Sequence, residues 1–190
     1  SGSMWGTKMS VARKALHLVG NALTMLEPLG VKWAANGFTT RRDSQASKYI
    51  NWDGSDRAES LQHYRFKGFG ESFRRAEVGA RVYSHSIQLG NNCDSESIQW
   101  GINELLKVKA DRHIVLVLSD GQPAFRGSSS GKRQLKEVIE GARKAGVQVG
   151  SIGICTNDPK AYYGQDTPTI HDAEELPQAI MEQARSWFLG

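Results

Sequence analysis

The residues best placed to do chemistry follow an apolar run in the second half of the chain. Residues 114–118 are five successive apolar residues, and Ser119, Asp120 and Gly121 come directly after them. This pattern predicts a strand over 112–119 that is buried on both faces and ends in a carboxylate and a tight turn. Ligand sites in open α/β sheets lie just beyond the carboxyl ends of strands, so Asp120 is a candidate site residue. Taken alone, the Ser-Asp-Gly sequence is also compatible with a simple turn.

Two further groups of oxygen-bearing side chains lie where a loop leads into a predicted helix. Ser1 and Ser3 place two hydroxyls on the short loop at the start of the chain, and Asp94 and Glu96 open a later helix. Mg²⁺ prefers hard oxygen ligands in octahedral array and keeps some of its waters, so hydroxyls and carboxylates from separate loops suit it. We therefore predict an all-oxygen cation site formed by Ser1, Ser3, Asp94, Glu96 and Asp120, with Mg²⁺ as the expected ion and Mn²⁺ or Ca²⁺ as alternatives.

The composition is that of an ordinary globular protein. A length of 190 residues predicts one domain, and contents of 39% hydrophobic and 23% charged residues are typical of a packed core with a polar surface. No apolar run approaches the roughly 20 residues needed to cross a bilayer, so no membrane partner is expected. Cys93 and Cys155 form neither a metal-ligand pattern nor a disulfide framework, which favours a reducing cytoplasm.

Basic residues gather in the first half of the chain, although the net charge of +4 is modest. A nucleic-acid surface is one interpretation of this gathering. A solvated loop and helix face is favoured instead, because the stretch carries no stacking platform and no groove-reading motif. The basic residues are Arg41, Arg42, Lys48, Arg57, Arg65, Lys67, Arg74, Arg75 and Arg81.

The beginning of the chain is predicted to be a helix followed by a strand. Apolar residues recur at helical spacing over 8–27, and Pro28 and Gly30 are expected to end that helix. Residues 31–38 then have the pattern of a strand. A helix that returns to a strand is half of a βαβ unit, so the first strand of this unit is expected to precede Ser1.

The polar stretch 39–62 is predicted to be a long loop, in which Tyr49 and Trp52 either contact a partner or tuck the loop onto the body. The other expected strands are at 63–66, 112–119 and 147–154, with an edge strand at 167–170. The other expected helices are one at 72–86, one ended by Gly146 and a closing one at 177–189. A turn-rich loop at 89–96 leads into one more helix, with Asp94 or Ser95 as N-cap and a core stripe of Ile98, Ile102, Leu105 and Leu106. Alternating strands and helices predict an α/β fold, a Rossmann-like three-layer sandwich with a largely parallel sheet and helices on both faces.

Two of the candidate loops resemble the metal-ion-dependent adhesion site of the von Willebrand factor A (VWA) domain. The sequence Ser-Gly-Ser-Met at 1–4 is similar to the first motif, Asp-x-Ser-x-Ser, and Leu-Ser-Asp-Gly at 118–121 is similar to the third. The Asp of the first motif and the strand before it are expected upstream of residue 1, so residues 1–190 are expected to be one VWA domain, a fragment that begins inside this motif. The second motif is normally a Thr in a Gly-rich loop, and the matching place at 92–96 has no Thr.

In this second loop the sequence resembles one branch of the family, the VWA domain at the C-terminus of the cobaltochelatase CobT subunit. There the second loop reads Asn-x-Asp-x-Glu followed by an apolar residue and a Trp. The matching residues here are Asn92, Asp94, Glu96, Ile98 and Trp100, and further similarity lies at His63, 37–40, 73–76, 162–163 and 172–176. The resemblance covers nearly the whole chain.

The resemblance implies a non-catalytic, metal-ion-dependent protein-interaction module. In such chelatases an AAA+ ATPase subunit works with the VWA subunit, and a large subunit holds the tetrapyrrole and inserts cobalt in cobalamin biosynthesis. The VWA metal is presented to a partner's carboxylate. By this resemblance Ser1 and Ser3 are direct ligands and Asp120 acts through water or orients the ligands, while one of Asp94, Ser95 or Glu96 replaces the usual Thr.

Two other functions fit parts of the sequence. A stand-alone VWA ligand-binding or scaffold module, unrelated to tetrapyrroles, would need no ATPase partner. A metal-assisted hydrolase is disfavoured, because no Ser, Cys or His has the spacing of a nucleophile and its base. The histidines occur singly, at His17, His63, His85, His113 and His171.

Overall fold

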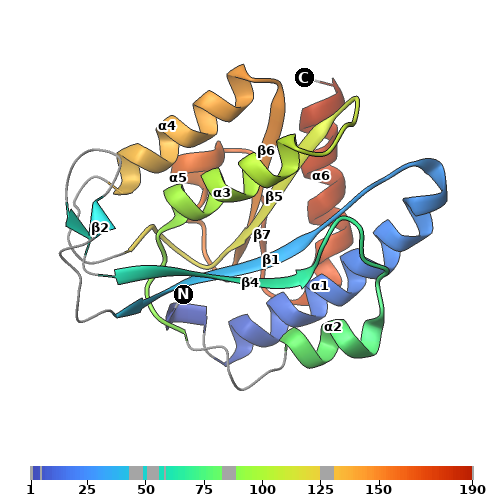
Figure 1. The fold of residues 1–190 in the computed structure, drawn as a ribbon, viewed down its shortest axis with the longest axis horizontal. Helices are drawn as coiled ribbons and strands as arrows, with labels where there is room; N and C mark the ends of the chain where they lie inside the picture. Colours follow the sequence, from blue (N-terminus) through green and yellow to red (C-terminus); the bar gives the residue numbers. More distant parts are fainter. Residues whose placement is uncertain are drawn as a thin grey trace.

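Helices and strands alternate along most of the chain (Figure 1). The computed structural model describes residues 2–4, 6–42, 49–50, 56–57, 59–82, 89–124 and 131–189. Its elements are η1 (Gly2–Met4), α1 (Thr7–Leu26), η2 (Glu27–Leu29), β1 (Ala35–Arg42), β2 (Tyr49–Ile50), β3 (Asp56–Arg57), β4 (Glu59–Lys67), α2 (Arg75–Val82), α3 (Asp94–Leu106), β5 (His113–Ser119), α4 (Gly131–Lys144), β6 (Val147–Ile154), α5 (Lys160–Tyr163), β7 (Thr169–Ile170), η4 (Ala173–Glu175) and α6 (Leu176–Leu189).

A parallel sheet of β5, β6 and β7, with β6 in the middle, forms the centre of the fold. Parallel neighbours need a crossover connection, and the chain passes through α4 between β5 and β6. Side chains alternate across β6, so Val147 and Val149 enter one hydrophobic cluster while Ile152 and Ile154 enter another. The predicted buried strand at 147–154 is confirmed residue for residue.

Helices cover both faces of this sheet, which confirms the predicted three-layer α/β architecture. On one face Ile98 and Ile102 of α3 pack with Leu135 and Ile139 of α4. On the other face side chains of α1 and α6 pack around β6 and β7. No helix among the described residues is long and apolar enough to span a membrane.

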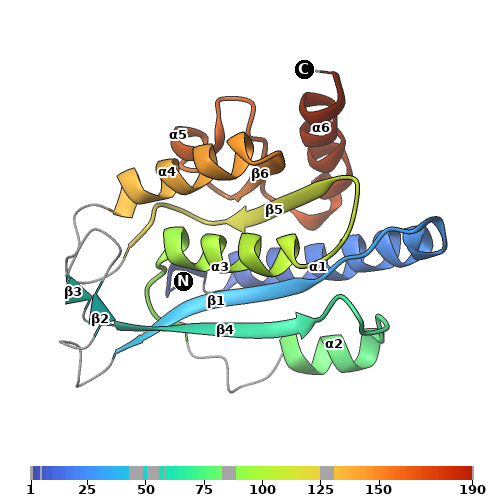
Figure 2. The ribbon, with the colours of Figure 1, turned by 45° about the horizontal axis from the view of Figure 1, so that its top comes forward.

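β1 and β4 form an antiparallel pair, which Figure 2 shows beside α3. Among the described residues this pair is a separate sheet from β5, β6 and β7. α3 lies over this pair, and the ring of its Trp100 stacks on His63 of β4 with 4.3 Å between centroids and 12° between planes. The sheet was predicted to be largely parallel, and the antiparallel pairing of β1 with β4 is therefore an addition to the expected topology.

The first strand begins later than predicted. The expected strand at 31–38 is β1 at Ala35–Arg42, so the start of the predicted loop at 39–62 is strand instead. Thr39 and Thr40 are buried there, opposite Gln62 and Leu61 of β4. β-branched residues favour extended backbone, which offsets the polar character that suggested a loop.

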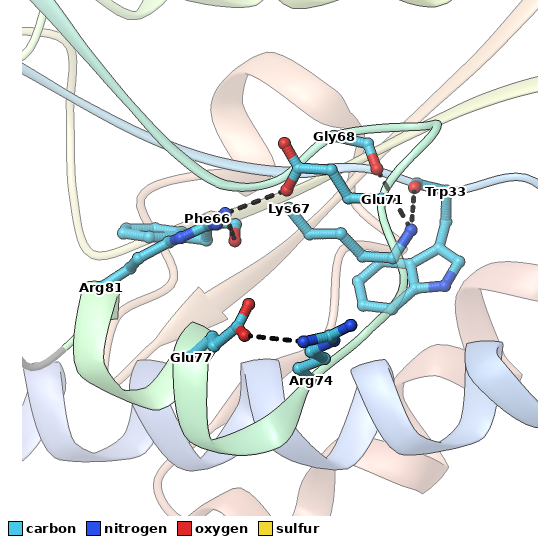
Figure 3. A network of polar contacts seen from close by, with 8 residues as sticks. All are labelled: Trp33, Phe66, Lys67, Gly68, Glu71, Arg74, Glu77 and Arg81. Atoms are coloured by element: carbon cyan, nitrogen blue, oxygen red, sulfur yellow. Dashed lines mark hydrogen bonds and ion pairs between the residues drawn. The ribbon is translucent and has the colours of Figure 1, made fainter.

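Lys67 explains why the strand does not start at residue 31 (Figure 3). Its ammonium donates to the carbonyl oxygen of Trp33 at 2.9 Å and to that of Gly68 at 3.2 Å, and it lies 4.3 Å from the centre of the Trp33 ring. Trp33 also donates from Nε1 to Glu27 at 2.8 Å, and Glu27 lies 3.5 Å from the same ammonium. Side chains therefore hold the backbone at Trp33, and a sheet ladder does not.

The other predicted elements are present with changed ends. The helix expected at 72–86 begins later, at Arg75 of α2, and its predicted end at 83–86 lies outside the described residues. Phe73 precedes the helix and packs on Trp33. Leu106, expected in the core stripe of α3, is 47% exposed, and Ile114 of the strand expected to be buried on both faces is 39% exposed. The side chains of Tyr49 and Trp52 lie outside the described residues.

Gly150 of β6 is required by the close approach of α6. An added Cβ would collide with the side-chain oxygen of Gln183 and lie 2.5 Å from Cζ2 of Trp187. We expect Gly150→Ala to lower the free energy of unfolding by about 2 kcal/mol, because overpacking forces side chains and backbone to shift. Urea denaturation measures the free energy of unfolding of the variant and the wild type. Gly141→Ala on the exposed side of α4, where an added Cβ meets nothing, is the matched control and should stabilise by up to about 1 kcal/mol. Equal effects of the two variants would contradict the packing described for α6.

Candidate metal centre

Asp120 lies directly after β5, beside the start of α1. Only 7% of the residue is exposed. Lys8 of α1 places its ammonium 3.6 Å from Oδ2 of Asp120 and donates to the Asp120 carbonyl oxygen at 3.3 Å. The predicted candidate therefore lies at the carboxyl end of a parallel strand, where ligand sites of α/β sheets are found.

Asp94 is the first residue of α3 and is 3% exposed. Its Oδ2 accepts a hydrogen bond from Nδ2 of Asn92. The prediction that Asp94 or Ser95 caps this helix is wrong, because Cys93 occupies the N-cap position, where its side chain accepts no hydrogen bond from the helix backbone. The helix begins one residue earlier than a cap at Asp94 requires, and the Asp94 carboxylate accepts hydrogen bonds from the Asn92 side chain and from its own backbone N–H.

Asn92 joins the Asp94 loop to the Asp120 loop. Its backbone N–H donates to Ala124 at 2.7 Å, and the Ala124 N–H donates back at 3.1 Å. Nδ2 of Asn92 also donates to the carbonyl oxygen of Gln122 at 3.1 Å. The two predicted acidic loops are therefore held together by hydrogen bonds between residues that are far apart in the sequence.

A buried carboxylate on β4 holds the other side of this loop. Glu59 is 4% exposed and accepts hydrogen bonds of 2.6 Å from both Thr40 and Asn91. The backbone N–H of Thr40 donates to the Asn91 carbonyl oxygen at 2.9 Å. Position 90 must be glycine for this approach, because an added Cβ would collide with the carbonyl oxygen of Thr40.

The electrostatics of Asp94 follow from its burial. Desolvation raises the pKa of Asp94 to about 7, the hydrogen bond from Asn92 opposes this rise, and the negative charge of Asp120 adds to it. The charge of Asp120 is thus one of the smaller influences on the pKa of Asp94, after burial and the hydrogen bond from Asn92. Lys8 places a positive charge 3.6 Å from Oδ2 of Asp120.

The remaining predicted ligands lie around this pair in different ways. Glu96 accepts a hydrogen bond from Sγ of Cys93 at 3.4 Å, and its charge acts on His63. Within the described ranges no three His, Cys, Asp or Glu side chains form a metal-binding group, so Glu96 does not complete a trio with Asp94 and Asp120. Ser3 is exposed in η1, and Ser1 lies outside the described residues.

The donor set at this place fits a hard divalent cation. The carboxylates of Asp94 and Asp120 are hard oxygen donors, which are the ligands that Mg²⁺ prefers. Both are buried, and a buried carboxylate is costly unless a positive charge compensates it. The Lys8 ammonium, 3.6 Å from Oδ2 of Asp120, reduces this cost, and a divalent cation bound between the loops would reduce it further.

Sequence reasoning assigned no role to Lys8 and did not single out Glu59. The position of Lys8 could have suggested a role at the site, since it lies in the first turn of the helix that follows the Ser1–Ser3 motif. Glu59 carries none, because its partner Asn91 is 32 residues away and only the pairing of β4 with β1 brings them together.

The fold and the paired loops define the class of protein. A parallel α/β sheet covered by helices on both faces, with acidic side chains beyond the carboxyl end of β5, is the arrangement expected of a VWA domain. The family model described as the cobalamin biosynthesis protein CobT VWA domain matches residues 1–190. The chain therefore belongs to the CobT VWA domain family.

Two solved structures share the fold. The pilus adhesin SpaC from Lactobacillus rhamnosus GG is similar with a TM-score of 0.56 and 16% identity, over 98% of this chain and 29% of the adhesin chain. Proximal thread matrix protein 1 from the mussel byssus is similar with a TM-score of 0.51 and 13% identity, over 91% of this chain and 41% of the mussel chain. This chain spans less than half the length of either protein.

Removing the carboxylate of Glu59 tests whether it holds the Asn91–Asn92 loop. Glu59→Ala leaves Thr40 and Asn91 without their acceptor, and we expect the free energy of unfolding to fall by about 3 kcal/mol. Glu104→Ala, which removes an exposed i,i+3 pair with Lys107, should cost no more than about 0.5 kcal/mol. Urea denaturation of both variants makes the comparison, and similar small losses would contradict a structural role for Glu59.

The His63–Trp100 stack predicts a pH dependence of stability. Burial lowers the pKa of His63 below 6.5, and the charge of Glu96 only partly opposes this effect. The folded state therefore binds the His63 proton less tightly than the unfolded state, so stability is lost as pH falls from 6.5 through the folded pKa. His63→Phe keeps an aromatic ring without a proton. We expect its melting temperature to fall less than that of the wild type when pH is lowered through this window, and parallel curves would contradict the assignment.

Proposed function

We propose that this domain is a metal-ion-dependent protein-interaction module of a cobaltochelatase, working with an AAA+ ATPase subunit and a large subunit in cobalt insertion into a tetrapyrrole. The observation that carries the proposal is that Asn92 links Asp94 to the loop after Asp120, through its hydrogen bonds to Asp94 and to the Gln122 carbonyl oxygen, in a chain of the CobT VWA domain family. Cobalt and the tetrapyrrole are cargo of the large subunit in this proposal.

Asp120 and Asp94 are the residues that would hold a resident Mg²⁺, with hydroxyls of Ser1 and Ser3 as further ligands. Mn²⁺ and Ca²⁺ are alternatives because they accept the same oxygen donors. When bound, the ion offers an open position to a carboxylate of a partner, as cations in dehydrated sites do. The hydrogen bonds of Asn92 would fix the distance between the two acidic loops, so that the ligands are in place before the metal arrives.

The protein in this proposal needs no turnover of its own. Its role is to present a binding surface whose strength depends on the metal, while the ATPase supplies the energy for assembly. A stand-alone VWA module would use the same site for a ligand outside any chelatase. The fold likeness to the adhesin and the mussel protein does not favour this alternative, because likeness at this level of identity extends to the fold alone.

Calorimetry with Mg²⁺ tests the metal site. We expect Asp120→Asn and Asp94→Asn each to weaken Mg²⁺ binding by about tenfold or more, because each removes a charged oxygen donor. Asp111→Asn changes an exposed carboxylate before β5 and is the matched control, with affinity equal to that of the wild type. Equal binding by all four proteins would place the metal elsewhere, and no binding by the wild type would overturn the metal dependence.

A second measurement separates the chelatase role from the stand-alone module. The protein is mixed with the AAA+ ATPase subunit of the same source, and complex formation is measured by light scattering with Mg²⁺ and with a chelator. A complex that forms only with Mg²⁺ and is lost in Asp120→Asn supports the proposal. Intact metal binding without any complex would favour the stand-alone module.

A further inference from the structure

Lys8 makes a contact that its place in the helix does not explain. It is the second residue of α1, where the positive end of the helix dipole disfavours a cation, and the first turn of α1 contains no acidic residue. Its ammonium instead reaches Asp120, 112 residues away, at 3.6 Å from Oδ2 and 3.3 Å from the carbonyl oxygen. The contact with Asp120 is therefore what compensates for the unfavourable position.

The burial of the two partners is unequal. The side chain of Asp120 is 5% exposed and that of Lys8 is 29% exposed. The carboxylate is thus fixed at the end of β5, while the ammonium, on a flexible four-carbon stem, approaches it from the solvent side. An ammonium in this position can leave towards water without unpacking the core, whereas Asp120 cannot follow it.

We propose that Lys8 is a built-in counter-ion of Asp120 that competes with the divalent cation and sets the metal affinity of the site. This inference rests on the proposed function, since it assigns a further residue to the same metal site. Mg²⁺ binds carboxylate oxygens at about 2.1 Å, and an ammonium held near the same carboxylate repels it. Metal binding therefore requires Lys8 to leave Asp120, and the free energy of their contact is subtracted from the free energy of metal binding.

Competition of this kind has two consequences of opposite sign. Without metal, Lys8 stabilises the fold by neutralising a buried carboxylate, so removing its charge should lower the melting temperature. With metal, the same removal should strengthen binding, because no contact has to be broken first. A Lys8 with a purely structural role would lower the melting temperature and leave metal affinity unchanged or weaker.

The test compares Mg²⁺ affinity by calorimetry and the metal-free melting temperature for the wild type, Lys8→Met and Lys8→Gln. We expect both variants to bind Mg²⁺ about three- to tenfold more tightly than the wild type, and to melt at a lower temperature without metal. Lys14→Met removes an exposed lysine from the same helix and should change neither quantity, which controls for net charge. Lys8→Arg keeps the positive charge and should keep the wild-type affinity.

Each result decides between the inference and the proposed function. Wild-type binding with equal or weaker binding by Lys8→Met and Lys8→Gln, both shown to be folded by circular dichroism, would overturn the role of Lys8 and leave the metal site standing. Binding by the variants but not by the wild type would support strong competition. No binding by any of the proteins would overturn the metal site, and with it the inference.

Discussion

The segment Asn91–Asn92 is the connection on which the candidate site depends. On one side the buried carboxylate of Glu59 and the backbone of Thr40 hold Asn91 against the β1–β4 pair. On the other side Asn92 pairs with Ala124 and donates to Asp94. Two sheets with separate strand ladders in the described part of the chain are therefore joined beside the acidic side chains.

Burial makes the acidic pair costly, and the surrounding groups reduce that cost in different ways. The hydrogen bond from Asn92 favours the charged form of Asp94, but desolvation prevails and raises its pKa to about 7. Lys8 reduces the cost for Asp120 by direct contact of charge with charge. A protein core without a ligand gains nothing from two buried carboxylates placed together, so their cost is evidence that the position serves something other than folding. Perturbed pKa values in such a place are typical of functional sites.

The predictable part of the fold was the part with strong periodicity. The apolar runs of β5 and β6 and the helical spacing in α1 identified the parallel sheet and its covering layers from the sequence. The start of β1 was not predictable, because the contacts of Lys67 with Trp33 depend on a residue 34 positions away. At the site, residue types singled out Asp94 and Asp120, since carboxylates at loop ends are visible in any sequence. The position of Lys8 in the first turn of α1 was visible in the sequence, but its partner was not, and Glu59 gave no signal at all, because only the tertiary fold brings each partner near.

The inferred competition at Asp120 gives the proposed function a physical advantage. A site that binds its cation very tightly would hold it in every state of a chelatase. Occupancy of the site would then be the same with and without the partner subunit. An ammonium that occupies the carboxylate lowers the affinity, and a partner's carboxylate that completes the coordination then adds the stabilisation that the metal alone lacks. Metal and partner would each bind more tightly in the presence of the other, since linkage between two binding events is reciprocal. On this argument Lys8 weakens the binding of the cation alone, so that the cation and the partner bind firmly only together. Such coupling suits a subunit that must associate with its partner and release it repeatedly.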